Sequence, residues 1–168
     1  MQISSIKNKN AGFTLIESMI AIALIVSGIT GLMVLVNRSM GFANLAFNQL
    51  TAANLAQEGI ELVRNIRDNN WMNKKNWLTG LNVGTYQIDY LDGKLIDFSE
   101  REEQTLFFDE DNGYSYIYAS GGETFYYRKI ELTLINDNEL RVKSIIIWSA
   151  KGGKNFETIA EDHLFNWL

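Results

Sequence analysis

The chain of 168 residues contains no cysteine and no proline, and its only histidine is His163. Without cysteine the chain can form neither a disulfide nor a zinc–thiolate centre, and it has no thiol nucleophile. A single histidine argues against a histidine-based catalytic triad and against a metal centre with several histidines. Because proline is absent, no residue in the first seventy positions forces a helix to end.

Basic residues are the minority, with 15 lysines and arginines against 20 aspartates and glutamates. Of the acidic residues only Glu17 precedes residue 37, so the carboxyl-terminal part carries nearly all of the negative charge. A surface with this balance does not displace counterions from phosphates, and direct nucleic-acid binding is not expected. The sequence offers no paired carboxylates, no Ser–His–Asp set and no lysine-based catalytic set, so we expect neither an enzyme nor a bound cofactor.

The longest apolar run, SMIAIALIVSGITGLMVLV at residues 18–36, carries no charge. As a helix it would be roughly 28 Å long, close to the ~30 Å hydrocarbon core of a bilayer, and it is predicted to span a membrane. Lys7 and Lys9 precede the run and Arg38 follows it. From this excess of positive charge we expect the amino terminus in the cytoplasm and the carboxyl-terminal part outside.

A carboxylate, Glu17, stands directly before this run, where an unpaired charge near the hydrocarbon is costly. The small residue Gly12 also precedes the run, whereas an ordinary secretory signal has its small-residue cleavage site after the run. The stretch GFTLIE at residues 12–17 resembles the prepilin signature of type IV pilins and type II secretion pseudopilins. The likeness covers roughly residues 7–40.

The resemblance implies a processing site and an assembly residue. In that family a membrane aspartic peptidase cuts after the glycine, here between Gly12 and Phe13, and methylates the new amine of Phe13. The carboxylate of Glu17 would then pair with the Phe13 amine of a neighbouring subunit, or of its own chain, because an unpaired buried ion costs several kcal/mol. The alternative is that Glu17 is a solvated residue at the membrane surface.

Beyond the membrane run the pattern stays helical. Two apolar rows follow the spacing of one helix face: Ala52, Ala56, Ile60 and Val63 beside Leu55, Gly59, Leu62 and Ile66. The residues expected on the opposite face are Gln57, Glu58, Glu61, Arg64, Arg67 and Asp68, with Glu61 and Arg64 spaced to pair. Asn69 and Asn70 end the predicted helix, which from Phe13 would be roughly 85 Å long.

From Gly84 onward the apolar period changes to two, which predicts strands. The expected strands lie at about 84–90, 94–98, 114–118, 125–135, 139–149 and 156–167, with turns at Asp92-Gly93, Asn112-Gly113, Asp137-Asn138 and Gly152-Gly153. They would form a largely antiparallel meander of about four to six strands. The apolar inner face of this sheet must be buried against another element. The predicted fold class is therefore α+β and pilin-like, with a long amino-terminal helix packed on a carboxyl-terminal antiparallel β-sheet.

Four parts of the chain are expected. They are a cytoplasmic leader peptide at 1–12, the transmembrane half of the stem helix at 13–37, its extramembrane half at 38–70 and a β-rich globular domain at 71–168. The order of the strands in the sheet does not follow from the sequence.

Three segments of the β-rich domain invite a functional interpretation. Residues 109–113, DEDNG, gather oxygen ligands that suit calcium, but the glycine and glutamate of an EF-hand loop are not in place. Some pseudopilins bind calcium in a carboxyl-terminal loop, so the resemblance keeps that ion open, although we favour an acidic hairpin turn. The charge run at 99–103 reads as a solvated loop. An aromatic group is expected to lie partly in the core and partly in a contact with other subunits. Its members are Tyr114, Tyr116, Tyr118, Phe125, Tyr126 and Tyr127.

The resemblance implies a structural, minor subunit of a type IV pilus or type II secretion pseudopilus, most like V-type minor pilins or I-type pseudopilins. Its partners would be prepilin peptidase, other pilin or pseudopilin subunits, the inner-membrane assembly platform and membrane lipid. It would cross the inner membrane once before assembly and lie in a cell-surface or periplasmic filament afterwards. One alternative is a monomeric membrane-anchored binding module or adhesin. Another is a competence pilin for DNA uptake, with a local basic patch of Arg128, Lys129, Arg141 and Lys143.

Overall fold

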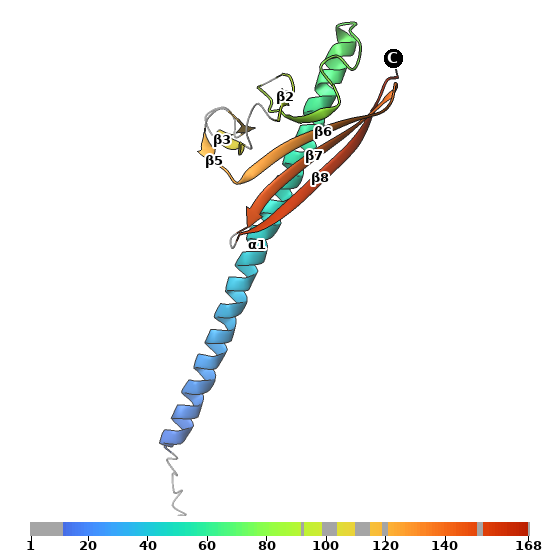
Figure 1. Ribbon diagram of the computed structural model, residues 1–168. Coiled ribbons are helices and arrows are strands. Elements are labelled where there is room, and N and C mark those ends of the chain that lie inside the picture. Colours follow the sequence, from blue (N-terminus) through green and yellow to red (C-terminus); the bar gives the residue numbers. More distant parts are fainter. Residues whose placement is uncertain are drawn as a thin grey trace, which may run out of the picture. The chain divides into compact units, whose positions relative to one another are not determined.

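The computed structural model describes residues 12–91, 93–98, 104–109, 115–118, 121–150 and 153–167 (Figure 1). Its elements are the helix α1 (Leu15–Met72) and the strands β1 (Gly84–Gln87), β2 (Ile96–Asp97), β3 (Phe107–Asp109), β4 (Ser115–Ile117), β5 (Gly122–Glu123), β6 (Tyr126–Asn136), β7 (Glu139–Ala150) and β8 (Lys154–Phe165). The chain forms two compact units, one ending at Asn44 and the other spanning Leu45–Leu168. The predicted α+β, pilin-like architecture is confirmed.

The first unit contains the amino-terminal half of α1. By length and composition this helix can cross a membrane, and none of its most apolar segment is buried inside the protein. Large apolar side chains on all sides of the helix are more than half exposed, among them Ile16, Ile20, Leu24 and Leu32. A helix that is apolar all round needs lipid or other helices around it, because water does not stabilise it.

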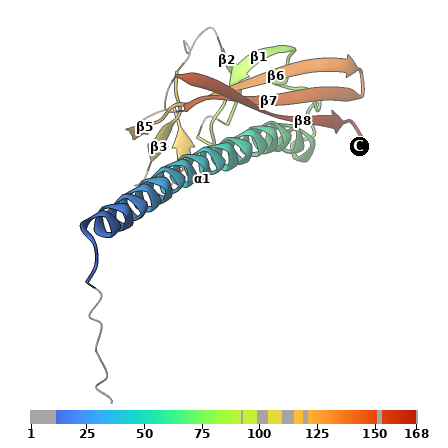
Figure 2. The same ribbon diagram turned by 90° about the horizontal axis from the view of Figure 1, so that it is seen from below.

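In the second unit, α1 presents one face to the sheet. The buried residues of this face are Ala52, Leu55, Ala56, Gly59, Ile60, Val63, Arg67 and Asn70. The predicted apolar stripe is therefore confirmed, with Leu62 and Ile66 partly buried at its margins. Figure 2 shows this half of α1 running along one face of the larger sheet. The prediction for Arg67 is wrong: it lies on the buried face, not the solvated one.

The larger sheet has five strands in the order β2-β1-β6-β7-β8, and every neighbouring pair is antiparallel. The three long strands β6, β7 and β8 form a meander, with the expected turn at Asp137-Asn138. Alternation places a row of apolar side chains toward α1, among them Ile130, Leu132, Val142 and Ile146, each at most 2% exposed. These side chains and the stripe on α1 fill the core.

Between β2 and β6 the chain builds a second, three-stranded sheet in the order β4-β3-β5. The single meander expected from the sequence is therefore wrong in part, because the chain leaves the larger sheet after β2 and returns at β6 beside β1. The carboxylate of Asp89 follows β1 and accepts hydrogen bonds from the backbone N–H groups of Leu91 (2.9 Å) and Tyr118 (2.8 Å). Asp89 thus ties the segment after β1 to the residue that follows β4.

The aromatic group divides between core and surface. Tyr118 and Tyr126 are buried, whereas Phe125 and Tyr127 are 42% and 37% exposed. Several predicted features lie outside the described residues: the leader before Gly12, the turn residues Asp92, Asn112, Gly113 and Gly152, the aromatic residue Tyr114 and the charge run at 99–103.

Gly59 sets how closely α1 approaches the sheet. A Cβ atom added there would lie 2.3 Å from Ser144 Oγ on β7 and 2.9 Å from Ile130 Cδ1 on β6. Glycine costs a helix interior about 1 kcal/mol relative to alanine, so its place here is explained by the space it frees. The backbone of α1 can therefore lie directly against β6 and β7.

We expect Gly59→Ala to lower the free energy of unfolding by about 2 kcal/mol, because the clash outweighs the gain in helix propensity. Urea unfolding of a fragment spanning residues 45–168, which contains both buried clusters, measures this. Ser144→Ala removes the atom nearest to the added methyl group, and the double variant should recover part of the loss. A single variant as stable as the original fragment would contradict the close approach.

Candidate functional site

The candidate site is the start of α1, where Gly12, Phe13 and Thr14 precede the first helical residue, Leu15. The side-chain Oγ1 of Thr14 accepts a hydrogen bond from the backbone N–H of Glu17 (3.3 Å). The carbonyl oxygen of Thr14 accepts the N–H of Ser18 (3.1 Å). Thr14 is therefore the N-cap of the helix, and Thr-x-x-Glu is the sequence of a capping box.

This local geometry gives Glu17 a role that the sequence interpretation missed. Glu17 lies in the first turn of α1 and its side chain is exposed. A carboxylate there interacts favourably with the positive end of the helix dipole, typically by about 0.3–1 kcal/mol. The signal for this role in the sequence is the spacing of Thr14 and Glu17, which matches a capping box as well as the prepilin signature.

The proposed cleavage site lies outside the helix. Gly12 and Phe13 are exposed and have no helical backbone, and no atom lies within 4 Å of a Cβ built on Gly12. An exposed non-helical peptide bond is the kind of bond that a peptidase can bind in extended form. Removal of residues 1–12 would leave Thr14 and its hydrogen bond to Glu17 intact, so processing and the start of the helix are compatible.

The other predicted sites receive less support. Of the possible calcium loop, only Asp109 belongs to the described residues, and it is the last residue of β3. The part of the chain that the structure describes contains no group of three or more acidic or histidine side chains placed to hold a metal ion. Residues 110–113 lie outside that part.

The basic patch left open for DNA binding does not form as one surface. Arg128 is fully buried beneath α1, where its Nη1 donates to the carbonyl of Leu55 (3.3 Å) and lies 3.2 Å from Glu58 Oε1. Lys129 pairs with Glu131 (2.8 Å) and Lys143 pairs with Glu161 (3.2 Å). With one member buried and two neutralised by carboxylates, these four residues do not present a surface that attracts phosphate.

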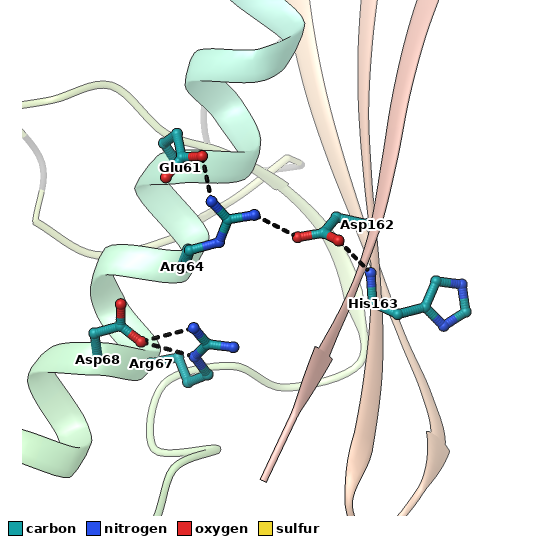
Figure 3. A network of polar contacts seen from close by, with 6 residues as sticks. All are labelled: Glu61, Arg64, Arg67, Asp68, Asp162 and His163. Atoms are coloured by element: carbon teal, nitrogen blue, oxygen red, sulfur yellow. Dashed lines mark hydrogen bonds and ion pairs between the residues drawn. The ribbon is translucent and has the colours of Figure 1, made fainter. Parts of the chain in front are cut away.

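A polar network links α1 to β8 (Figure 3). Arg64 pairs with Glu61, as the spacing predicted, and its Nη2 also donates to Asp162 Oδ2 on β8 (2.7 Å). The hydrogen bond with Asp162 is the main reason why the pKa of Arg64 is raised. The other oxygen of Asp162 accepts the backbone N–H of His163 (2.9 Å). The network therefore joins the helix to the backbone of the last strand.

Arg67 lies against the rings of two neighbouring tryptophans. Its guanidinium lies 4.5 Å from the ring centroid of Trp71 and 5.2 Å from that of Trp167, and it pairs with Asp68 at 2.8 Å. An open groove of about 410 Å³ is lined by these four residues and Met72. The long side chain covers apolar surface while the charge stays over the rings, which explains why an arginine lies on the buried face. The contact attaches the carboxyl-terminal segment to the end of α1.

These features define an α+β protein in which an antiparallel sheet packs on a long helix with an uncovered apolar start. A family model, the prokaryotic N-terminal methylation motif, matches residues 7–33. The motif and the long apolar helix are consistent with a type IV prepilin-like protein, so the resemblance seen in the sequence is confirmed. Neither a curated protein nor a solved structure matches the chain significantly.

The single histidine should show a raised pKa. His163 Nδ1 lies 2.7 Å from Glu139 Oε1, and its Nε2 lies 3.5 Å from Glu161 Oε1. The hydrogen bond with Glu139 is the first cause of the raised pKa of His163. The folded state binds the proton of His163 more tightly than the unfolded state does, so the protonated imidazole stabilises the fold. This contribution is fully present below the unfolded pKa of about 6.5 and is lost as the pH rises through the pKa of the folded state.

An NMR titration of the imidazole should therefore give a pKa above about 6.5, and Glu139→Gln should lower it, because the amide keeps a hydrogen bond but not the charge. One histidine makes the signal unambiguous. An unchanged pKa in the variant would show that Glu139 does not hold the proton.

Proposed function

We propose that this protein is a filament subunit, inserted in the inner membrane, cut between Gly12 and Phe13, methylated at Phe13, and assembled into a type IV pilus or type II secretion pseudopilus. The observation that carries the proposal is the methylation motif at residues 7–33, which includes most of the charge-free apolar run at 18–36. The role is structural rather than catalytic, and it places the protein beside prepilin peptidase, an inner-membrane assembly platform and other subunits.

The exposed apolar side chains of α1 support assembly through the helix. In the membrane, lipid covers them; in a filament, the helices of neighbouring subunits replace that lipid. Because the helix carries no charge from Ser18 to Val36 and exposes apolar side chains there, it can be surrounded by other helices. A protein that only needed an anchor would require the same apolar length, but it would not require the cleavage signature before it.

Glu17 gives the transfer from membrane to filament a defined register. Cleavage creates a cation at the Phe13 amine, and this cation enters an apolar bundle when the subunit assembles. A carboxylate from a neighbour offsets the charge, whereas an unpaired buried ion would cost several kcal/mol. The exposed side chain of Glu17 is available for such a pair because the capping contact uses its backbone N–H.

Within the class, we assign a minor subunit. The chain resembles V-type minor pilins and I-type pseudopilins in pairing glycines within the membrane helix, Gly28 and Gly31, with the stretch AQEGIE at residues 56–61. Gly59 in that stretch also has a local reason, the close approach of α1 to the sheet, so the two glycines of the membrane segment are the stronger part of the likeness.

The first experiment is mass spectrometry of the amino-terminal peptide from a host that supplies prepilin peptidase. We expect the chain to begin at Phe13 with a mass increased by one methyl group, because the prepilin signature that GFTLIE resembles is cut after its glycine. Gly12→Leu, which replaces the small residue, should leave residues 1–12 attached. A wild-type chain that still begins at Met1 would contradict processing.

A pair of variants at Glu17 separates its two roles. Glutamine can replace glutamate in a capping box but carries no charge. We therefore expect Glu17→Gln and Glu17→Ala to insert in the membrane and to lose assembly to a similar extent, measured as the fraction of subunit in sheared filaments. Normal assembly of the glutamine variant alone would show that assembly requires a polar side chain at this position and not its charge. Normal assembly of both would show that assembly does not require Glu17, whereas absence of the original chain from sheared filaments would favour a membrane-anchored binding module.

A further inference from the structure

One end of the second unit exposes large apolar side chains. Met72, Val83 and Trp167 are 81%, 63% and 67% exposed. Trp167 follows β8 and lies beside Trp71 near the end of α1, with ring centroids 6.0 Å apart, and Figure 2 shows these ends of α1 and β8 side by side. Val83 precedes β1, whose first residue pairs with Leu132 near the end of β6. A protein surface in water rarely gathers such side chains unless another apolar body covers them.

The loop between α1 and β1 holds these side chains outward. Its own apolar anchors, Trp77 and Leu81, are buried in the core. The side-chain Nδ2 of Asn70 donates to the carbonyls of Trp77 (3.1 Å) and Thr79 (2.8 Å) and so ties the loop to α1. Because the loop is fixed at these points, the exposure of Met72 just before it belongs to the fold.

The end of α1 places a lysine where glycine is usual. The N–H of Lys74 donates to the carbonyl of Trp71 (2.9 Å), and the N–H of Lys75 donates to that of Asn70 (2.8 Å), which is a Schellman motif. Lys74 has a φ of 56°, a conformation that favours glycine. The helix dipole favours a cation near this end, but Lys75 already provides one without that backbone strain. The strained Lys74 therefore points to a use of its charge outside the chain.

The segment that follows Asp68 carries positive charge only. Residues 69–88 contain no aspartate or glutamate, whereas the chain as a whole is acidic. Lys74 and Lys75 are exposed, and neither forms an ion pair within the part of the chain that the structure describes. Asp68 itself is paired with Arg67 at 2.8 Å. The two ammonium groups are therefore available to an anionic partner.

A second copy of the chain fits this end poorly. If the same surface of two copies met across a two-fold axis, four unpaired lysines would lie together. Among the described carboxylates near this end, Asp68 is paired with Arg67 and Glu139 with His163, which leaves Asp137 in the turn after β6. A second copy therefore has little negative charge to offer here.

Soluble anionic polymers match only part of the surface. Nucleic acids and acidic glycans would use the charges of Lys74 and Lys75 and the ring of Trp167. Such contacts would leave Met72 and Val83 in water. A bilayer surface instead presents negative headgroups above an apolar layer, and it takes lysine, tryptophan and aliphatic side chains in one contact.

We infer that this end surface binds the surface of a bilayer that contains anionic lipid. Its residues are Met72, Lys74, Lys75, Val83 and Trp167. The apolar side chains would enter the headgroup region, and the two lysines would lie against the negative headgroups. This inference goes beyond filament membership, which depends on the amino-terminal helix, and it does not require cleavage after Gly12.

The test uses the full chain in nanodiscs of phosphatidylcholine, so that the apolar segment of α1 is already covered by lipid. The probe is a vesicle of equal parts phosphatidylcholine and phosphatidylglycerol. In a flotation assay the loaded discs should bind these vesicles, whereas empty discs should not, and vesicles of phosphatidylcholine alone should bind far less. The affinity should fall as salt is raised, because charge attraction contributes to binding. Bromine-labelled vesicle lipid should quench tryptophan fluorescence, and Trp167→Phe should remove most of that quenching.

Matched variants identify the surface. Lys74→Gln and Lys75→Gln should each weaken vesicle binding about fivefold, the contribution of one lysine near an anionic membrane. Lys154→Gln removes the same charge at the opposite end of β8 and should leave the Kd unchanged. Met72→Gln should also weaken binding. Lys74→Gly relieves the backbone strain, so it should raise the free energy of unfolding while it weakens binding, which a purely structural role of Lys74 does not predict.

Several results would overturn the inference. They are no binding of the original chain to anionic vesicles, an equal loss in Lys154→Gln, and unchanged binding in both lysine variants of the end surface. Binding of single-stranded DNA or heparin as tightly as the vesicles, with Met72→Gln having no effect, would assign the surface to an anionic polymer instead.

Discussion

The inner face of the larger sheet depends on one cover, the half of α1 that begins at Leu45. The side chains that β6 and β7 direct toward the helix include Ile130, Val142 and Ile146, and each is fully buried in the folded chain. A sheet of this kind cannot bury one apolar face by itself, so the helix contact is a condition for the strands rather than an addition to them. Gly59 determines how close that contact is, because without a side chain it allows the helix backbone to approach Ser144 and Ile130.

The same helix meets two different requirements along its length. Near Leu24 its apolar side chains are exposed on every side, whereas near Ile60 they form one stripe against the sheet. The first pattern is stable only in lipid or among other helices, and the second only on a folded domain. A single helix, α1 from Leu15 to Met72, therefore supplies both patterns.

The sequence predicted those features that repeat over many residues. The apolar stripe, the long strands β6 to β8 and the turn at Asp137-Asn138 each have a period or a turn signal extending over enough positions to be recognised. The second sheet was missed because β3 and β5 have three and two residues, too few for alternation to show. The strand order was not predictable either, because β1 and β6 are brought together by packing and not by a short turn.

Single polar residues escaped prediction for a different reason. A helical period assigned Arg67 to the solvated face, but Trp71 and Trp167 lie close enough to cover its side chain, and Trp167 is a hundred residues away along the chain. Arg128 was counted as a surface cation, yet it is buried beneath α1, where it bonds Leu55 and Glu58. Partners that come from distant segments leave no trace in local spacing, so such residues can be placed only by the fold.

The residues of the candidate site could be proposed from the sequence, whereas the local geometry around them could not. The spacing of Gly12, Phe13 and Glu17 is visible in the sequence, and the match to the methylation motif supports its interpretation. The structure adds that Thr14 caps the helix through the backbone N–H of Glu17. A chain that begins at Phe13 would retain this cap, so the helix start would be ordered before any subunit contact forms. Glu17 can thus order the helix through its backbone while its exposed carboxylate remains free to meet a cation, and the two roles do not compete for the same atoms.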